Sequence, residues 1–267
     1  KNFTSVEFVI VDGELKIDPV TDKVTVTVTE NSGTATYDGA EHTVKGYASK
    51  TADNNLYDVT TSVKETETDA WTAKGTYVGE YPVGIVAGDF ENTNKNFMNV
   101  EFVIVDGALT ITASTEEVVV TIAGGTATVT YDGEKHSVDG YEIEGISNSL
   151  YKPEDFRLAE GASAHAEGTD ADEYPMGLTS GSFENTNQNF SNVKFVVTDG
   201  KLTITPRTVT LTSETAEKEY DGTPLTRPNV TGGDGFVTGE VTDITATGSV
   251  TYVDEGEVIN TITFTPG

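Results

Sequence analysis

The sequence repeats itself along its whole length. Residues 1–13 return as residues 95–107 and again as residues 188–200, each time as an Asn-Phe pair followed by an apolar run that ends in Asp-Gly. A second stretch, rich in Asn and Thr, spans residues 88–94 and recurs at residues 181–187 in the same register. Chance markers do not keep a common spacing of roughly 90 residues, so the pattern predicts duplication of one small domain.

A Tyr-Asp-Gly triplet is the third marker, and it begins at Tyr37, Tyr131 and Tyr220. A Gly-x-Leu-x-Ile segment ends each unit, and the first strand of the next unit follows after a few residues, too few for independent tumbling. We therefore expect four segments. They are the closing strands of a preceding repeat at 1–18, complete repeats at 19–112 and 113–205, and at 206–267 a third repeat of a sister subtype without its closing strands.

The composition favours strands over helices. The chain holds 44 Thr, and residues 23–29 alternate apolar and Thr side chains with the period of two that is typical of a half-buried strand. Residues 118–122 and 208–212 form comparable runs. The best helical candidate is residues 152–159, whereas its counterpart, residues 58–64, reads as strand with at most one helical turn. We expect a mainly β fold made of a tandem array of small β-sheet domains.

Two kinds of turn are predicted at Asp-Gly pairs. Asp106-Gly107 and Asp199-Gly200 each lie between two apolar runs, as does the pair at Asp12, and this arrangement is a strong β-hairpin signal. In the Tyr-Asp-Gly triplets, Asp supplies a side-chain acceptor for the backbone and Gly supplies a positive φ. We interpret these triplets as tight turns rather than as ligand-binding loops.

Charge and cysteine content exclude several classes of function. The formal net charge is −28, the wrong sign for neutralising nucleic-acid phosphates. The chain has no Cys, so it has no disulfide, thiolate zinc site or cysteine nucleophile. No apolar run reaches the length of a membrane span. We expect neither nucleic acid nor membrane insertion as a partner of this segment.

No constellation of catalytic residues is apparent. His42 and His136 occupy the same place in two repeats and His165 stands alone, so no repeated set of zinc ligands converges. The nucleophile-elbow, phosphate-loop and zinc-protease motifs are missing from the sequence. Trp71 has no counterpart in the second repeat, and we interpret it as a core residue. We predict that the protein is not an enzyme and needs no cofactor.

Calcium is the one metal for which the sequence offers ligands. Acidic and amide oxygens gather where the two complete repeats carry the Glu-Asn-Thr-Asn stretch, and calcium takes six to eight such oxygens. The favoured alternative is a solvated connection in which Asn and Thr bond the local backbone, since no Asp-x-Asp-x-Asp-Gly loop occurs. The candidate residues are Asp89, Glu91, Asn92 and Asn94, and in the second repeat Glu184, Asn185 and Asn187.

The markers together resemble the MBG and YDG repeat families. The resemblance rests on the Tyr-Asp-Gly triplet, on the Glu-Tyr-Pro strands within residues 79–82 and 172–175, and on the closing Val-x-Phe-Val-x-x-Asp-Gly-x-Leu-x-Ile. It implies tandem β-grasp-like modules in an extended rod, with an Ig-like sandwich as the alternative. The third repeat departs from the pattern, because residues 220–225 lack the His and the Asn-rich loop is absent.

The resemblance also implies a place and a role. Such repeats occur in large surface proteins of Gram-positive bacteria, many of them adhesins, so we expect an extracellular location with wall anchoring through regions outside this segment. The expected function is a non-catalytic stalk or spacer whose partners are its neighbouring repeats. Two alternatives stay open: the repeats themselves bind host glycan or protein, or the closing strands at 1–18 complete residues 206–267 of another copy and build a head-to-tail fibre. For the two incomplete ends we favour the other account, in which the sequence is a segment of a longer repeat protein.

Overall fold

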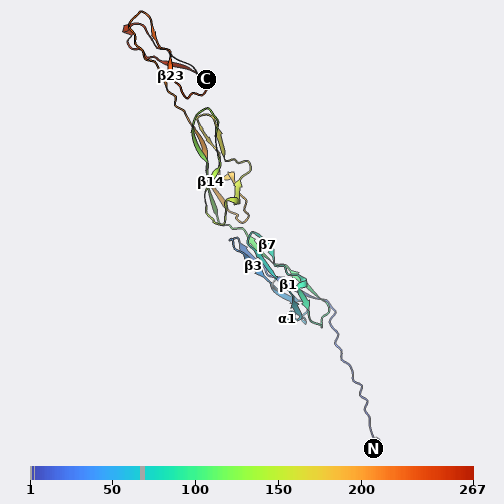
Figure 1. Cartoon of the computed structure of the whole chain (residues 1–267). Helices are drawn as coiled ribbons and strands as arrows, with labels where there is room; N and C mark the ends of the chain where they lie inside the picture. The colour runs from blue at the N-terminus through green and yellow to red at the C-terminus, as the bar shows by residue number, and fades with distance from the viewer. Residues whose placement is uncertain (1, 3, 67–69) are drawn as a thin grey trace. The chain divides into compact units, whose positions relative to one another are not determined.

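The computed structural model describes residue 2, residues 4–66 and residues 70–267. The fold is mainly β, with many small separate sheets, and this confirms the predicted fold class. Figure 1 shows the course of the chain. The structure divides into two compact units: residues 1–117 with Asn187–Asn192, and Val118–Thr186 with Val193–Gly267. The four predicted segment boundaries stay predictions, and each unit is described by itself.

The first repeat contains ten strands, one helical turn and one short 3-10 helix among its described residues. They are β1 (Val24–Glu30), β2 (Gly33–Thr36), β3 (His42–Lys45), β4 (Tyr47–Ala52), α1 (Val59–Ser62), β5 (Val63–Glu65), β6 (Thr72–Gly75), β7 (Gly79–Pro82), η1 (Ala87–Asp89), β8 (Phe90–Asn92), β9 (Val100–Val105) and β10 (Ala108–Thr112).

Two three-stranded sheets hold the core of the first repeat. β1 lies between the antiparallel β4 and the parallel β9, and β10 lies between the parallel β2 and the antiparallel β7. Alternate residues of β1 are buried, with Val24, Val26 and Val28 fully so, as the predicted half-buried strand requires. β10 adds Leu109 and Ile111 to the same core. The closing strands β9 and β10 therefore complete both sheets.

The second repeat has the same architecture. Its sheets run β14-β11-β19 and β12-β20-β17, with the same parallel and antiparallel pairings as in the first repeat. Its elements are β11 (Val118–Gly124), β12 (Thr126–Thr130), β13 (His136–Asp139), β14 (Tyr141–Ile146), η2 (Pro153–Asp155), β15 (Phe156–Leu158), β16 (His165–Gly168), β17 (Glu173–Pro175), η3 (Ser180–Ser182), β18 (Phe183–Asn185), β19 (Val193–Thr198) and β20 (Lys201–Thr205).

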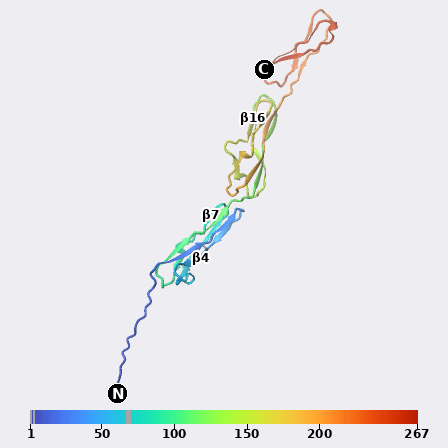
Figure 2. The same ribbon diagram turned by 180° about the vertical axis from the view of Figure 1, so that it is seen from behind.

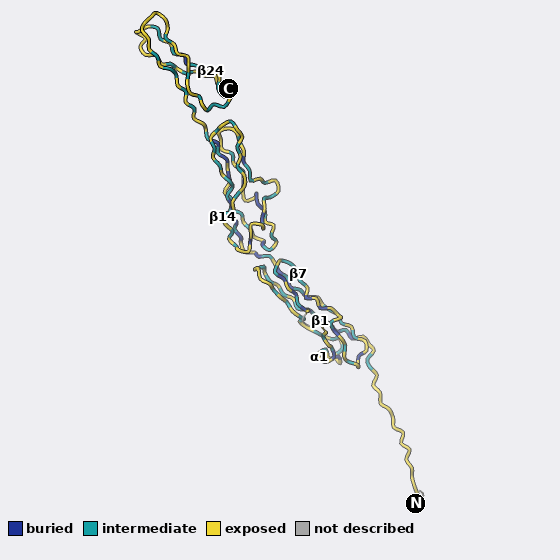
Figure 3. The backbone as a smooth tube through the Cα atoms, viewed as in Figure 1, coloured by how far each residue is buried: buried dark blue, intermediate teal, exposed yellow. Residues whose placement is uncertain are grey.

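The third repeat forms only two-stranded sheets, with the orders β21-β23, β22-β25 and β24-β26. Among residues 206–267, all of them described, Ala246 is the one buried apolar side chain, and Figure 3 shows mostly intermediate and exposed colours there. The predicted strand at 208–212 is reduced to β21. The elements are β21 (Leu211–Ser213), β22 (Leu225–Thr226), β23 (Val230–Gly232), β24 (Val241–Ala246), β25 (Ser249–Val250), η4 (Val253–Glu255) and β26 (Ile262–Pro266).

The segment before the first repeat forms no sheet. Residues 4–18 carry no assigned strand, and Figure 2 shows them as a single extended trace. Their apolar side chains, including Phe8 and Ile10, are exposed. Part of the predicted preceding repeat, Lys1 and Phe3, lies outside the described residues. These described residues therefore carry the closing-strand sequence but form no assigned strand.

The predicted Asp-Gly hairpins are wrong. β9 and β10 flank Asp106-Gly107 but belong to different sheets, and β19 and β20 separate in the same way at Asp199-Gly200. Gly107 lies outside the left-handed region, and a Cβ on it would lie 2.3 Å from the carbonyl oxygen of Asn31. This glycine permits a close backbone approach where the chain crosses between sheets.

The predicted helix over residues 152–159 is also wrong beyond its first turn. Pro153–Asp155 forms a short 3-10 helix, and Phe156–Leu158 continues as β15, which pairs with β18. Burial of Phe156 in the core favours the strand over the local helical preference. In the first repeat, Asp58 caps the single turn α1, in line with the prediction of at most one turn there.

Candidate functional site

The Tyr-Asp-Gly triplet forms a tight turn in all three repeats. Its glycines have φ values of 80°, 81° and 76° at Gly39, Gly133 and Gly222. In each turn the Asp side chain accepts a hydrogen bond from the backbone N–H two residues further on, at 2.8 to 2.9 Å. The predicted turn chemistry is therefore present in every copy.

The repeated histidines hold these turns. His42 and His136 lie at the starts of β3 and β13, and their Nε2 atoms lie 3.0 and 2.9 Å from Oδ1 of Asp38 and Asp132. The backbone N–H and then the histidine lower the pKa of each aspartate. These contacts give the histidines a structural role at the edge of a strand.

In the first unit the first Tyr-Asp-Gly turn receives residues from the second repeat. The ring of Tyr37 packs against Tyr77 and meets Phe190 edge-on, with ring centroids 6.3 and 5.3 Å away. The backbone N–H of Val78 donates to Oδ1 of Asn189 at 2.9 Å. Ser114 forms a parallel bridge with Phe190. We call this group the first junction.

The second turn has a similar neighbour within the second unit. The hydroxyl of Tyr131 bonds Glu240, which raises the pKa of Tyr131 and lowers that of Glu240. A Cβ placed on Gly133 would lie 2.7 Å from the side chain of Val237, so the turn touches the third repeat closely. The tyrosine of the triplet is thus a contact residue in both units.

The first calcium candidates are engaged in contacts within the chain. Oδ2 of Asp89 accepts hydrogen bonds from Nε1 of Trp71 and from the backbone N–H of Val86, both at 2.9 Å. Glu91 is exposed and pairs with Lys64 at 3.2 Å. Trp71 itself is buried in the core, where we expected it.

The two candidate asparagines fasten the loop to the core. Oδ1 of Asn92 accepts from the hydroxyl of Tyr57 at 2.8 Å, and its Nδ2 donates to the carbonyl of Phe97 at 2.9 Å. Nδ2 of Asn94 donates to Oγ of Ser62, also at 2.9 Å. These bonds match the interpretation of the stretch as a connection in which Asn side chains bond their surroundings.

The second loop repeats this arrangement. Oδ1 of Asn185 accepts from the hydroxyl of Tyr151 at 2.9 Å. Oδ1 of Asn187 accepts a backbone N–H two residues further on, and Glu184 pairs with Arg157. In the part of the chain that the structure describes, no three His, Asp or Glu side chains lie close enough together to hold a metal. The calcium hypothesis stays a prediction.

Removal of divalent cations is expected to leave thermal stability unchanged. The amide oxygens of Asn92 and Asn185 already accept hydrogen bonds from Tyr57 and Tyr151, so a cation would have to displace those bonds. Thermal unfolding followed by circular dichroism, with a chelator and then with excess calcium, measures this. A melting temperature that rises with calcium and falls back with chelator would contradict the expectation.

In each complete repeat a carboxylate accepts two backbone N–H groups near the closing strands; that of Glu30 is buried and that of Asp199 is exposed. Glu30 is buried, and its two oxygens accept the backbone N–H groups of Ile85 at 2.5 Å and Gly107 at 2.7 Å. In the second repeat, Asp199 accepts the backbone N–H groups of Gly177 and Leu178 at 3.0 and 2.8 Å. A carboxylate that accepts two backbone N–H groups is therefore supplied by Glu30 in the first repeat and by Asp199 in the second.

Sequence reasoning missed Glu30, Tyr57 and Tyr151 as key residues. The signal for the tyrosines was available, because a Leu-Tyr pair recurs in the repeat register at Leu56 and Leu150. No periodic signal marks Glu30, since Gly124 occupies its place in the second repeat. Its role follows only from the contacts that it makes in the folded chain.

No helix among the described residues is long and apolar enough to cross a bilayer. Comparison with protein-family models gave no match, and neither curated proteins nor solved structures provided one.

Proposed function

We propose that this chain is a non-catalytic structural spacer within an extracellular bacterial surface protein of the adhesin type. The observation that carries the proposal is the first junction, where Asn189 and Phe190 of the second repeat belong to the compact unit of the first. A built contact between successive repeats restricts bending there, and restricted bending is what a spacer requires.

Two further features support this function. Each complete repeat has its own buried core, so successive repeats add length without depending on one shared core. The excess of acidic residues, with a net charge of −28, favours solubility and discourages edge-to-edge association of exposed strands. The cell-surface location and the wall anchor come from the resemblance to the MBG and YDG families.

Small-angle scattering of the whole chain tests the proposal. A single compact domain of this length has a radius of gyration of about 18 Å. A spacer of successive repeats is expected to exceed that value clearly. A radius near the compact value would overturn the spacer function.

A junction variant makes the test specific. Tyr37→Ser combined with Asn189→Ala removes one ring and one side-chain acceptor from the first junction. The variant is expected to keep its circular dichroism spectrum but to give a scattering profile of a more flexible particle. Tyr220→Ser, at the exposed tyrosine of the third triplet, is the matched control and is expected to leave the profile unchanged.

A further inference from the structure

The first and last strands of the first repeat run side by side in the same direction. β1 pairs in parallel with β9, beginning with Val24 opposite Val100. β2 pairs in parallel with β10, ending with Thr36 opposite Thr112. Both pairings keep one register, so the two ends of the repeat form a single two-stranded arrangement that passes from one sheet to the other. We call it the parallel ribbon.

The second repeat has the same ribbon. β11 pairs in parallel with β19, beginning with Val118 opposite Val193. β12 pairs in parallel with β20 in the same register, ending with Thr130 opposite Thr205. In both repeats the chain therefore enters at one end of the ribbon and leaves at the other end.

Tension along the chain acts on such a ribbon in shear. A pull at Val24 toward the preceding residues and a pull at Thr112 toward the following ones would slide the two strands past each other. The evenly spaced hydrogen bonds of a parallel ladder then share the load, whereas a pull across the strands opens such bonds one after another. Because forced unfolding is governed by the unfolding rate, sharing the load raises the force that the repeat withstands.

Buried side chains shield the ribbon from water on both of its strands. Val24, Val26 and Val28 of β1 are fully buried, and Leu109 and Ile111 of β10 are buried as well. Hydrogen bonds are stronger in surroundings of low dielectric constant. Replacement of the ladder bonds by water therefore requires the strands to separate first.

The two strands stay in contact where the ribbon changes sheets. The ladder of the first repeat is interrupted between Thr29 and Gly33. Glu30 lies in this gap, and its Oε2 accepts the N–H of Gly107 on the other strand at 2.7 Å. In the second repeat the backbones themselves approach, since a Cβ on Gly124 would lie 2.3 Å from the nitrogen of Gly200.

The connection after the first ribbon is short and is itself hydrogen-bonded. Ser114 follows Thr112 by two residues and forms a parallel bridge with Phe190. The N–H of Ser114 donates to the carbonyl oxygen of Asn189 at 2.9 Å. Tension that leaves the first ribbon therefore reaches the next paired residue without a free linker.

We propose that each complete repeat is a module that bears tension along the chain through shear of its parallel ribbon. The bearing of tension as a function rests on the proposed spacer function, since a spacer that holds a bound surface is pulled at both ends. The mechanical resistance is a property of each repeat by itself.

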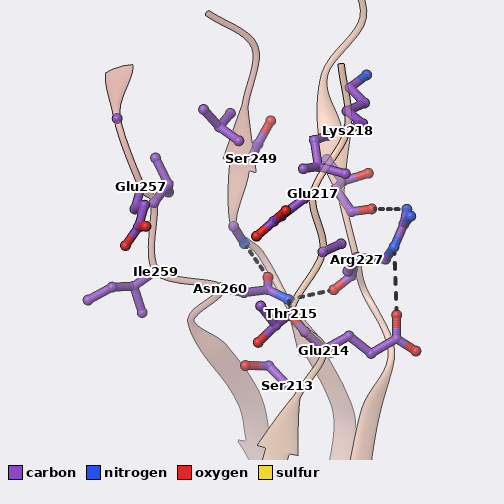
Figure 4. A pocket seen from close by; sticks show the side chains of 17 residues that line it. Ser213, Glu214, Thr215, Glu217, Lys218, Arg227, Ser249, Glu257, Ile259 and Asn260 are labelled. Atoms are coloured by element: carbon purple, nitrogen blue, oxygen red, sulfur yellow. Dashed lines mark hydrogen bonds and ion pairs between the residues drawn. The ribbon is translucent and has the colours of Figure 1, made fainter. Parts of the chain in front are cut away.

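The third repeat is held together differently. Residues 206–267, all of them described, contain antiparallel strand pairs and no parallel one. Nδ2 of Asn260 donates there to the carbonyl oxygens of Glu214 and Arg227, at 3.1 and 2.8 Å, beside a cavity of about 650 Å³ (Figure 4). The proposal therefore concerns the two complete repeats.

Single-molecule force spectroscopy of the full chain tests the loading geometry. The chain has no Cys, so pairs of introduced cysteines at exposed positions define where the handles pull. Asp22→Cys with Glu116→Cys loads the first ribbon in shear, and its unfolding releases about 340 Å of chain at ~3.6 Å per residue. Asp22→Cys with Asn55→Cys is the matched control. β4 runs antiparallel to β1 and brings these two positions to the same end, where a pull peels the strands apart.

At equal loading rate we expect the shear pair to unfold at a force at least about threefold higher than the control pair, because several ladder bonds share the load. A lower ratio would overturn the proposal. This result is distinguishable from the scattering test of the spacer function. A low ratio in an extended chain would overturn the bearing of tension alone, whereas a high ratio in a chain of compact radius would overturn the spacer and keep the resistance of the repeats.

The contact of Glu30 with Gly107 gives a second measurement. Glu30→Ala is expected to lower the force of the shear pair and to leave that of the control pair unchanged, because peeling starts at the far end of β1. Asp199→Ala lies in the second repeat, outside the loaded residues, and is expected to change neither force. Equal losses in both geometries would overturn the role of Glu30 in the ribbon.

Discussion

Replacement of Glu30 by Ala is expected to destabilise the first repeat by about 3 kcal/mol. The change removes both acceptors of a buried carboxylate and leaves the N–H groups of Ile85 and Gly107 without them. Hydrogen bonds to a charged group are the stronger kind, and an unsatisfied buried donor costs its full desolvation free energy. Urea unfolding followed by fluorescence measures the effect, because Trp71, the one Trp in the chain, is buried in this repeat.

Two variants make the result interpretable. Asp199→Ala removes the corresponding carboxylate from the second repeat, so it is expected to leave the Trp71 transition in place while lowering a second transition seen by circular dichroism. Glu30→Gln keeps one acceptor oxygen and is expected to lose less stability than Glu30→Ala. If the urea midpoint of the Trp71 fluorescence transition is unchanged in Glu30→Ala, the carboxylate of Glu30 does not stabilise the first repeat.

Replacement of Tyr151 by Ala is expected to cost the second repeat about 3–5 kcal/mol, the usual range for losing a buried aromatic ring. The ring is buried, and the hydroxyl donates to Oδ1 of Asn185 and lies 3.0 Å from the carbonyl of Asp155. Tyr151→Phe keeps the ring and is expected to lose only about 1 kcal/mol, the net contribution of a hydrogen bond. Urea unfolding followed by circular dichroism separates the two contributions.

The ionisation of Tyr151 gives a second readout. Burial, and then the charge of Asp155, raises the pKa of Tyr151 to about 12. A tyrosine whose pKa is raised by folding stabilises the native state below its unfolded pKa, and that stability is lost as pH rises toward the folded value. Stability is therefore expected to fall above pH of about 10, and to fall less steeply in Tyr151→Phe. Identical alkaline profiles would contradict the assignment.

The parts of the candidate site that are formed by residues close together in the sequence were predictable. The Tyr-Asp-Gly turns follow from an Asp acceptor and a Gly with positive φ that are adjacent in the sequence, and the structure has these turns at Gly39, Gly133 and Gly222. The contacts of the junction were not predictable in this way. Nothing near Tyr37 in sequence indicates that its ring meets Phe190, because that contact joins two repeats.

By itself the sequence determined that the chain is a set of related β-rich repeats, because register and period-two alternation are properties of the sequence alone. Only the tertiary structure decided which strands pair with one another in each sheet. It separated β9 from β10 at Asp106-Gly107 despite a strong local hairpin signal, since burial of Leu109 and Ile111 between β2 and β7 outweighs the preference of a turn. In the tertiary structure, the carboxylate that accepts two backbone N–H groups comes from Glu30 in the first repeat and from Asp199 in the second. Gly124 lies too close to Gly200 to carry a side chain, so the second repeat supplies its carboxylate from elsewhere.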